Sequence, residues 1–589
     1  MGSSHQSMFN YVISSWRAFR QQWARYLVLT GMMSAGTSWV LIPVLRWLVA
    51  RVLDANHVTY LTLTNLVPTF FGKPVAGGLL LLIGLGIVGL VYFEFIVLLT
   101  GVAQIRDQRT RGWRPLLQIS WRRLRQTRLT SLGLFILYVV LLVPFSVATA
   151  NSSLLAKVVI PNFIIDFLGK FPGLTVALFG LSVLLAYLGI RLMRVLPHMV
   201  CAGAGLRAAS RQSWRETRDI QWQLIGRFVT LTLSFFLVDF AWSSLLVGCQ
   251  KLLDRTPIAF AGALVIASVL IFGRLVLAAA TTTLMVFMML SPRTLTVDAV
   301  NSGTVPKQGR FWRLTGAFLI VLGCLAYATL SLQTTKTPLM ISHRGVDAGN
   351  GVQNTLPSLR RTAKLKPDFV EIDVHETKDN DFIMMHDENL RALTGVNATP
   401  RQRTLAQLTR LTAKENGHTA HLVSFEDYLT EAEKLGQRLV VELKPTTADS
   451  KHMVQTFMRR YGTRLEKDGN WIQSLNYPAL VAAQKTMPKL SMSLILPYTF
   501  VLPRANFNAY TLEETTLSSS IVRQAHADHQ QIWGWTVNDE QTMVHMTHIG
   551  VDGVITDNLS ELQRVVASQK HAVGYAYRIA ELDTLLQFE

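Results

Sequence analysis

The sequence predicts two fold classes in one chain: an N-terminal all-α polytopic membrane domain of about seven spans, and a C-terminal α/β barrel of the TIM-type (β/α)8 class. Two observations predict them. Long apolar runs are confined to residues 26–333, whereas residues 338–589 mix apolar and charged side chains as soluble domains do. Within this second region, short β-rich runs alternate with amphipathic stretches.

We expect the domain boundaries to follow this change of composition. Met1–Ser7 (MGSSHQS) resembles an expression leader, which makes Met8 the expected native start. The tail carries the apolar pattern Ile579–Leu586, which predicts a helix on the barrel or on the membrane surface. The expected parts are a leader and cytoplasmic interfacial helix (1–25), a transmembrane domain (26–333), a linker (334–337), a barrel (338–570) and a tail (571–589).

The membrane domain is predicted from the length of its apolar runs. A helix needs roughly 20 apolar residues to cross the hydrocarbon core of a bilayer. The runs that reach this length lie at about 27–49, 77–104, 131–150, 173–196, 228–249, 258–290 and 314–333.

Arginine is concentrated in the segments between alternate spans. Residues 105–129 hold eight arginines and one acidic residue, and residues 203–227 hold five arginines, whereas 54–75, 151–172 and 250–257 are poorer in basic residues. The positive-inside rule then predicts a cytoplasmic N-terminus and an extracellular barrel, in a multi-pass protein of a bacterial cell membrane. The same arginines account for the net charge of +19, so we expect no nucleic-acid partner.

A short repeat precedes several of the spans. Ser15–Arg17, Ser120–Arg122 and Ser213–Arg215 all read Ser-Trp-Arg, and Phe311–Arg313 is a fourth echo. The repeat predicts a basic, tryptophan-bearing helix in the cytoplasmic interface, followed by an out-and-back hairpin. The alternative is that tryptophan and arginine are simply common at such interfaces.

Two ionisable residues lie at membrane depth, Asp239 in the fifth run and Arg274 in the sixth. An ionisable group at this depth needs a partner or a water-filled cavity. We therefore expect either a structural pair or a lipid-headgroup site.

Eight short apolar runs predict the strands of the barrel. The turn at Asp379–Asn380 makes the second and third runs look like a hairpin, so we expect the barrel to be irregular there. The runs are Leu339–Ser342, Phe369–Val374, Phe382–Met385, Leu439–Leu443, Trp471–Leu475, Met492–Leu496, Gln531–Val537 and Gly553–Thr556.

Polar residues collect at the C-terminal ends of these runs. In a (β/α)8 barrel that face carries the active site. Glu371 and Asp373 are two positions apart, so both side chains lie on one face of a strand. The residues expected to converge are His343, Arg344, Glu371, Asp373, His386, Glu442, Lys444, Asn538 and Asp557.

An ordered set of motifs makes residues 338–570 resemble the glycerophosphodiester phosphodiesterase family. The membrane half resembles the membrane domain attached to some bacterial members of that family. The motifs are His343–Gly345, Asn354-Thr355, Glu371–Val374, Thr377–Asp379, His386-Asp387, Glu442–Lys444, Trp535–Asn538, Gly550–Gly553 and Thr556-Asp557.

The resemblance implies a metal site at Glu371, Asp373 and Glu442. Carboxylate oxygens are hard ligands, which suit Ca²⁺ or Mg²⁺ rather than zinc. A lone Glu-x-Asp is more often a solvated strand face, and here the surrounding motifs favour the metal.

The resemblance also implies the catalytic and substrate-binding residues. His343 and His386 would be the general acid and base, because imidazole titrates near neutral pH. Arg344 would hold the phosphate through its guanidinium fork, and Lys444 would add positive charge at the reacting phosphorus. Trp535 would form an apolar wall for the glycerol, with a core tryptophan as the alternative.

One departure from the family pattern stands beside the first motif. The family has Glu-Asn-Thr where this chain has Gln353–Thr355, and the preceding segment 346–352 is one residue longer and lacks the common proline. Gln353 can donate and accept hydrogen bonds but carries no charge. We expect activity to remain, since all three metal ligands are present. The histidines without a family role are expected at the surface or in loops: His375, His418, His421, His526 and His529.

Three functions follow as hypotheses. The first is a membrane-anchored, metal-dependent glycerophosphodiester phosphodiesterase that releases glycerol 3-phosphate and an alcohol. Its substrates would be small glycerophosphodiesters, glycerophosphate polymers such as lipoteichoic acid, or phospholipid headgroups, the last two favoured by tethering near membrane lipids. The second is a phospholipase-D-like lipid phosphodiesterase, and the third is a non-catalytic membrane scaffold or lipid transporter. The oligomeric state is open.

Overall fold

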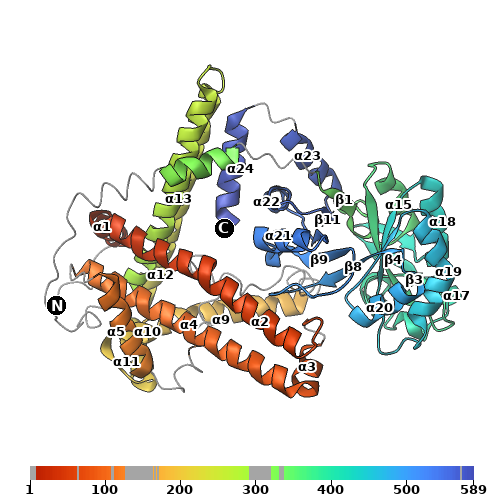
Figure 1. The fold of residues 1–589 in the computed structure, drawn as a ribbon, viewed down its shortest axis with the longest axis horizontal. Helices are drawn as coiled ribbons and strands as arrows, with labels where there is room; N and C mark the ends of the chain where they lie inside the picture. Colours follow the sequence, from red (N-terminus) through yellow and green to blue (C-terminus); the bar gives the residue numbers. More distant parts are fainter. Residues whose placement is uncertain are drawn as a thin grey trace. The chain divides into compact units, whose positions relative to one another are not determined.

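The computed structural model describes residues 8–62, 65–107, 112–126, 172–290, 320–330, 337–570 and 574–588, together with the single residues 135, 164 and 168. The chain forms two compact units (Figure 1). The helical unit consists of Met1–His57, Pro68–Leu332 and Gly574–Leu586. The barrel unit consists chiefly of Val58–Val67 and Gln333–Val573.

Long apolar helices make up the helical unit. Its elements are α1 (Met8–Gly36), a π-helical turn (Thr37–Leu41), α2 (Ile42–Ala55), α3 (Leu66–Gly72), α4 (Pro74–Arg106), α5 (Trp113–Gln126), α9 (Pro172–Leu192), α10 (Val195–Ala202), α11 (Leu206–Arg218), α12 (Gln221–Leu253), α13 (Ala259–Met289) and α24 (Tyr575–Phe588).

Five helical segments in the described part of the chain are long and apolar enough to cross a membrane. They are Phe9–Ala55, Pro74–Arg106, Gly173–Ala202, Gln221–Leu253 and Ala259–Met289. The predicted span 131–150 lies outside the described residues apart from Phe135, and 314–333 is described only as the shorter helix Ile320–Leu330. The predicted polytopic all-α membrane domain is confirmed, with the number of spans approximate.

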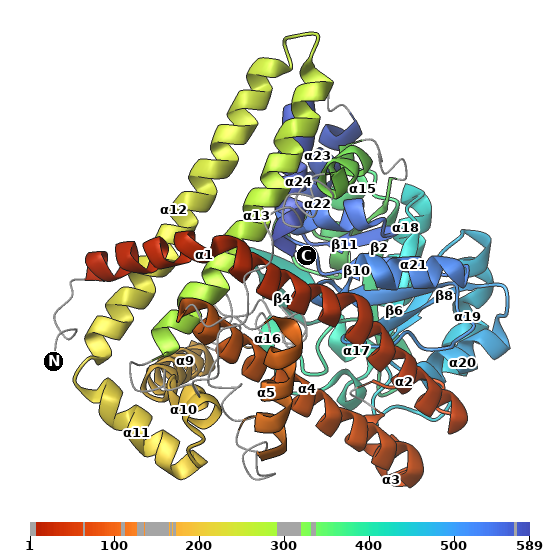
Figure 2. The same ribbon diagram turned by 60° about the vertical axis from the view of Figure 1, so that its left-hand side comes forward.

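Short basic helices accompany the long ones. α5 and α11 are polar and amphipathic, with arginines in their last turns, and each contains one Ser-Trp-Arg repeat. α11 leads into the antiparallel hairpin of α12 and α13, which Figure 2 shows side by side. The repeat serines Ser15, Ser120 and Ser213 are all buried, whereas Trp121 and Trp214 of the same motifs are exposed. The fourth echo, 311–313, lies outside the described residues.

The two ionisable residues at membrane depth pair with each other and with the C-terminal helix. Arg274 Nη1 donates to Asp239 Oδ1, and its Nε and Nη2 donate to Asp583 Oδ1 of α24 at 2.9 and 2.5 Å. Asp254 accepts the first backbone N–H groups of α24, from Tyr575 at 3.2 Å and Ala576 at 2.9 Å. α24 therefore packs against membrane-domain helices, and Arg274 makes a structural network.

Eight parallel strands close the barrel. Their order is β1-β11-β10-β9-β8-β7-β6-β2, and pairing of β1 with β2 completes the ring. They are β1 (Leu339–Ser342), β2 (Phe369–Glu376), β6 (Leu439–Leu443), β7 (Trp471–Ser474), β8 (Ser491–Leu496), β9 (Ala509–Glu513), β10 (Gln531–Trp535) and β11 (Gly553–Thr556).

Helices follow most of these strands. They are α15 (Leu356–Ala363), α18 (Phe425–Leu435), α19 (Met453–Lys467), α20 (Tyr477–Thr486), α21 (Ser519–Ala527), α22 (Glu540–Ile549) and α23 (Leu559–Lys570). An insertion between β2 and α18 holds β3 (Phe382–Met384), the one-turn helices α16 (Arg391–Thr394) and α17 (Leu405–Leu408), and the hairpin of β4 (Thr412–Glu415) and β5 (His418–His421).

One predicted strand was wrong and one was missed. The run at Phe382–Met385 is not a barrel strand: β3 pairs antiparallel with β2 across the turn at Asn380, as the expected hairpin implied. The missing barrel strand is β9. No α-helix separates it from β8, and its alternate residues Thr511 and Glu513 are polar, so the run is not conspicuously apolar.

A loop, in place of a helix, covers the surface between β8 and β9. Residues 497–508 connect the two strands, and Phe507 packs on Tyr477 of α20 with ring centroids 5.6 Å apart. Tyr60, from the segment of the barrel unit that precedes α3, stacks on the same Tyr477 at 4.4 Å. Thr59 O accepts the backbone N–H of Arg504.

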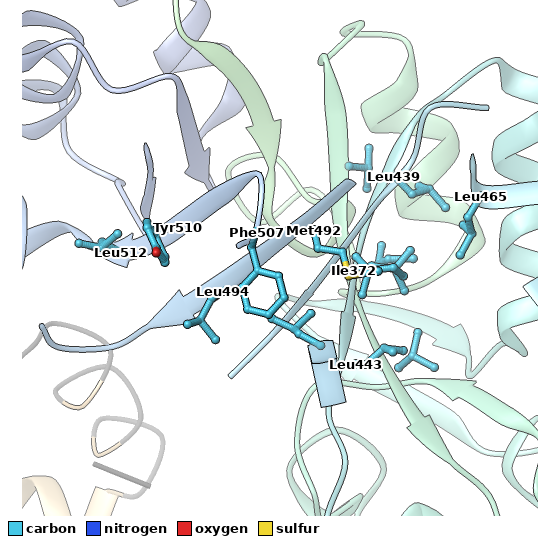
Figure 3. Close-up of a cluster of buried hydrophobic side chains, with 14 of the residues drawn as sticks. Ile372, Leu439, Leu443, Leu465, Met492, Leu494, Phe507, Tyr510 and Leu512 are labelled. Carbon is cyan, nitrogen blue, oxygen red and sulfur yellow. The ribbon is translucent and has the colours of Figure 1, made fainter. Parts of the chain in front are cut away.

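The alternation of side chains along the strands builds two apolar clusters. Val370, Ile372, Leu439 and Val441 pack outward against the helices, where Figure 3 shows Ile372 and Leu439 near Leu465 of α19. The neighbouring positions point into the barrel. There a second cluster closes the interior: Ile341, Phe369, Val440, Ala509, Trp533 and Ile555.

Candidate active site

The predicted metal ligands lie directly above the inner apolar cluster. Glu371 and Asp373 are two and four positions beyond Phe369 on β2, and Glu442 is two positions beyond Val440 on β6. A two-residue step keeps a side chain on the same face of a strand. All three carboxylates are therefore buried inside the barrel near the C-terminal ends of their strands.

The three carboxylates form one compact group. One oxygen of each lies within 4.8 Å of the others. Glu371 accepts hydrogen bonds from the Arg344 backbone N–H and from Gln473 Nε2, both at 3.1 Å. Asp373 accepts from Asn354 Nδ2 at 2.9 Å and from Lys444 Nζ at 3.3 Å.

Glu442 is held less completely. Its Oε1 is buried and is ion-paired with Lys444 Nζ at 3.3 Å, the same ammonium that pairs with Asp373. Three buried carboxylates also repel one another, and a bound cation removes that cost. This donor set of carboxylate oxygens fits Ca²⁺ or Mg²⁺.

Burial and mutual repulsion set the charges of the group. Burial raises the pKa of Glu371 well above its usual range, with Asp373 and Glu442 adding to the shift. Burial likewise raises the pKa of Glu442 to about 7. The pKa of Asp373 stays below its usual range despite burial, because Lys444, His386 and Arg344 favour its anion. Without a cation, Glu371 and Glu442 are therefore harder to ionise than free glutamates, whereas Asp373 is easier to ionise than a free aspartate.

Each predicted catalytic histidine is paired with an aspartate. His343, directly after β1, places Nδ1 2.8 Å from Asp557 Oδ1, and His386 places Nδ1 2.7 Å from Asp387 Oδ1. Asn538 Nδ2 donates to the other oxygen of Asp557 at 2.8 Å. An ionised aspartate at Nδ1 holds a proton there and leaves Nε2 to exchange protons with substrate.

The two histidines differ in their surroundings. Burial lowers the pKa of His386 to about 3, with Arg344 and Lys444 contributing, so its imidazole is neutral at pH 7. His343 Nε2 accepts a hydrogen bond from Arg344 Nε at 3.1 Å. Arg344 Nε therefore has to turn away from His343 Nε2 before that nitrogen transfers a proton.

The predicted substrate-binding residues surround the same point. Arg344 has a left-handed backbone (φ 54°) and directs Nη1 to Gln353 Oε1 at 2.9 Å, while its Nε lies 3.6 Å from Asp373 Oδ2. Lys444 lies between Asp373 and Glu442. Trp535, half-buried at the end of β10, packs on the inner apolar cluster.

Sequence reasoning misjudged one residue near the site. His375 was expected at the surface, but it is buried on β2, and its Nε2 lies 3.1 Å from the His386 carbonyl oxygen. Its place two positions after Asp373 on a buried strand was the signal. His418, His421, His526 and His529 are exposed as expected. Gln473 and Glu415 were not singled out, because neither belongs to a motif.

Two family descriptions match this chain. The membrane domain of glycerophosphoryl diester phosphodiesterase matches residues 12–328, more than half of the chain. The glycerophosphoryl diester phosphodiesterase family matches residues 343–561.

Individual relatives match the barrel. A glycerophosphodiester phosphodiesterase from Caldanaerobacter subterraneus is 25% identical over 246 residues, covering 39% of this chain and 97% of the relative. Human lysophospholipase D GDPD1 is 27% identical over 291 residues, covering 41% and 90%. A solved structure of an Oleispira antarctica phosphodiesterase in complex with sn-glycerol-3-phosphate is 22% identical, with a TM-score of 0.37, and covers 39% of this chain and 97% of its own.

The two family matches divide the chain in the same order as its helical and barrel units. The chain therefore belongs to the glycerophosphoryl diester phosphodiesterase family, as a membrane-anchored member that carries the family's membrane domain, and it is a phosphoric diester hydrolase.

Proposed function

We propose that this protein is a metal-dependent glycerophosphodiester phosphodiesterase in which His343 and His386 transfer the protons. One observation carries the proposal: three carboxylates lie within 4.8 Å of one another beside two histidines, each paired with an aspartate. A structural ion pair explains neither the excess of acid nor the two pairs.

Glu371, Asp373 and Glu442 would hold one divalent cation, Ca²⁺ or Mg²⁺. When bound, the cation would polarise the phosphoryl oxygen and favour deprotonation of the attacking hydroxyl. Arg344 binds the phosphate through its guanidinium, and Lys444 offsets the negative charge that grows on the phosphorus. Trp535 would form an apolar wall for the glycerol.

The neutral imidazole of His386 supports its role as the base, and His343 takes the complementary role of the acid. His386 is neutral at pH 7 and accepts the proton of the substrate's glycerol hydroxyl, whose oxygen forms a new bond to phosphorus. His343 donates a proton to the departing alcohol oxygen as its bond to phosphorus breaks. Water then opens the resulting cyclic phosphate with the two roles exchanged, which gives glycerol 3-phosphate.

The membrane anchor supports substrates at the bilayer. The arginine-rich segments favour an extracellular barrel, and tethering raises the effective concentration of polymers and lipids held at the same surface. We favour glycerophosphate polymers such as lipoteichoic acid. Lysophospholipid headgroups are the second candidate, because a relative that matches the barrel is named lysophospholipase D.

The experiment is release of glycerol 3-phosphate by the purified full chain, with chelator, Ca²⁺ or Mg²⁺. The substrates are glycerophosphocholine and lipoteichoic acid, followed by release of glycerol 3-phosphate, and lysophosphatidylcholine, followed by release of choline and lysophosphatidic acid. Lysophosphatidic acid as the product from the last would indicate the phospholipase-D-like reaction. His343→Ala and Glu371→Ala should lose release, whereas His452→Ala at an exposed position and Glu540→Ala should keep it. Full release in chelator would refute metal dependence.

A further inference from the structure

Gln353, where this chain departs from the family pattern, forms hydrogen bonds with a residue from a distant part of the barrel sequence. Gln353 is buried, with 7% of its surface exposed, and stands where the resembling family carries a glutamate. Its side-chain amide lies between Arg344 and Glu415, a residue of the inserted hairpin 62 positions further along the chain.

The hydrogen bonds fix the orientation of this amide. Glu415 Oε1 accepts from Gln353 Nε2 at 2.6 Å, and Glu415 Oε2 accepts from the Gln353 backbone N–H at 2.8 Å. With its NH₂ group committed to Glu415, Gln353 directs Oε1 to Arg344 Nη1 at 2.9 Å. The backbone N–H and the side-chain NH₂ of Gln353 therefore both donate to the carboxylate of Glu415.

The inserted hairpin places the carboxylate of Glu415 next to Gln353. Glu415 ends β4, and the turn to β5 uses left-handed backbone at Asn416 and Gly417. Ala413 of the same strand packs in an apolar cluster with Val352, the neighbour of Gln353. A side chain at Gly349, in the lengthened segment, would contact Asn416 at 3.4 Å. The loop and the hairpin thus fit each other closely.

We propose that Glu415 is a positioning residue for the phosphate-binding Arg344, acting through Gln353. The pair is reciprocal. A glutamate at 353 would face Glu415 across 2.6 Å, so the neutral amide and the distant carboxylate require each other. The inference rests on the proposed function of Arg344, and it links the inserted hairpin to substrate affinity.

The test is a swap of the two side chains in the full chain. Glu415→Gln leaves one acceptor for two donors, so the Gln353 amide loses its fixed orientation. We expect KM for glycerophosphocholine to rise about tenfold with kcat within about threefold. Gln353→Glu places two carboxylates together and should raise KM at least as much. The double variant Q353E/E415Q restores both hydrogen bonds with the charge at 353, and KM should return to within about threefold of wild type.

Further arms separate a local role from a general one. Lys414→Gln, an exposed change on the same strand, is the matched control and should leave KM unchanged. Glycerol 3-phosphate binding, measured by calorimetry, should follow the KM series. An unchanged KM in Glu415→Gln, or a double variant no better than Gln353→Glu, would overturn the inference while wild-type turnover upholds the proposed function. Absence of wild-type turnover would refute the proposed function. In that case, glycerol 3-phosphate binding that is equally tight in wild type and in all three variants would overturn the inference separately.

Discussion

Arg274 in the helical unit and Arg344 in the barrel are equally buried, with 14% and 16% of their side chains exposed, yet their surroundings differ. Arg274 closes its network, because Asp239 and Asp583 share one guanidinium and hold three helices together. Arg344 stands beside three clustered carboxylates, and Lys444 is the second cation that pairs with this cluster. Burial of charge alone does not mark a functional site; three buried carboxylates close enough to hold one cation do.

The largest expected effect lies in the barrel network. His386→Ala removes a proton-transfer group and should lower kcat by about 100- to 10,000-fold. Asp583→Asn alters the helical network and should leave the kcat of the folded protein within about twofold. The measurement is glycerol 3-phosphate release per folded molecule. A kcat of His386→Ala within tenfold of wild type would contradict a catalytic role for His386.

The ion pairs of Arg274 with Asp239 and Asp583 should contribute to the stability of the helical unit. Arg274→Met leaves two carboxylates without their cation and should destabilise the helical unit by about 3–5 kcal/mol. Arg255→Met, an exposed change near the end of α12, is the matched control. Thermal unfolding of the detergent-solubilised chain gives the comparison. Adding Asp239→Asn and Asp583→Asn to Arg274→Met should recover part of the loss, and failure to do so would show that the pairing is not the cause.

The stability of the barrel should depend on pH and on bound metal together, through the carboxylates Glu371, Asp373 and Glu442. Burial raises the folded-state pKa of Glu442 to about 7, above its unfolded value near 4.5. The metal-free barrel therefore loses stability as pH rises from about 4.5 to 7, because the folded state must release a proton that it binds more tightly than the unfolded chain does. Ca²⁺ or Mg²⁺ should raise the unfolding temperature by about 5 °C more at pH 8 than at pH 5. An equal shift at both pH values would contradict the assignment of Glu442 as a ligand.

The smallest expected effect is at the apolar wall. Trp535→Leu removes contact area next to the substrate and should raise KM for glycerophosphocholine about threefold to tenfold, with kcat nearly unchanged. Trp535→Phe should have the smaller effect. Steady-state kinetics on both variants, with unfolding temperature as a check on the fold, separate a substrate wall from a core tryptophan. A stability loss with unchanged KM would place Trp535 in the core.

Much of the site was predictable because it follows local patterns. The two-residue spacing of Glu371 and Asp373 fixes a shared strand face, and the family motifs name both histidines. The errors arose where the pattern was not local. β9 lacks a preceding helix and carries polar inward residues, and Phe382–Met385 belongs to a hairpin outside the ring.

The barrel prediction brought His343 and Asp557 to one site, but which residues pair across long sequence distances was beyond the sequence alone. The Asp557–His343 pair joins residues 214 positions apart, and Glu415 reaches Gln353 from an inserted hairpin. Neither distance is encoded in a spacing. Asp583 completes the Arg274 network from a tail for which the sequence left two docking surfaces open.

The most direct test of the central claim is a cation titration of the chelator-stripped full chain, followed by both binding and glycerol 3-phosphate release. We expect one Ca²⁺ or Mg²⁺ bound with high affinity per chain and activity rising in parallel, with both lost in Glu442→Gln and both retained in Asp239→Asn. Full activity without bound cation, or a Glu442→Gln variant that binds and turns over like wild type, would contradict the account.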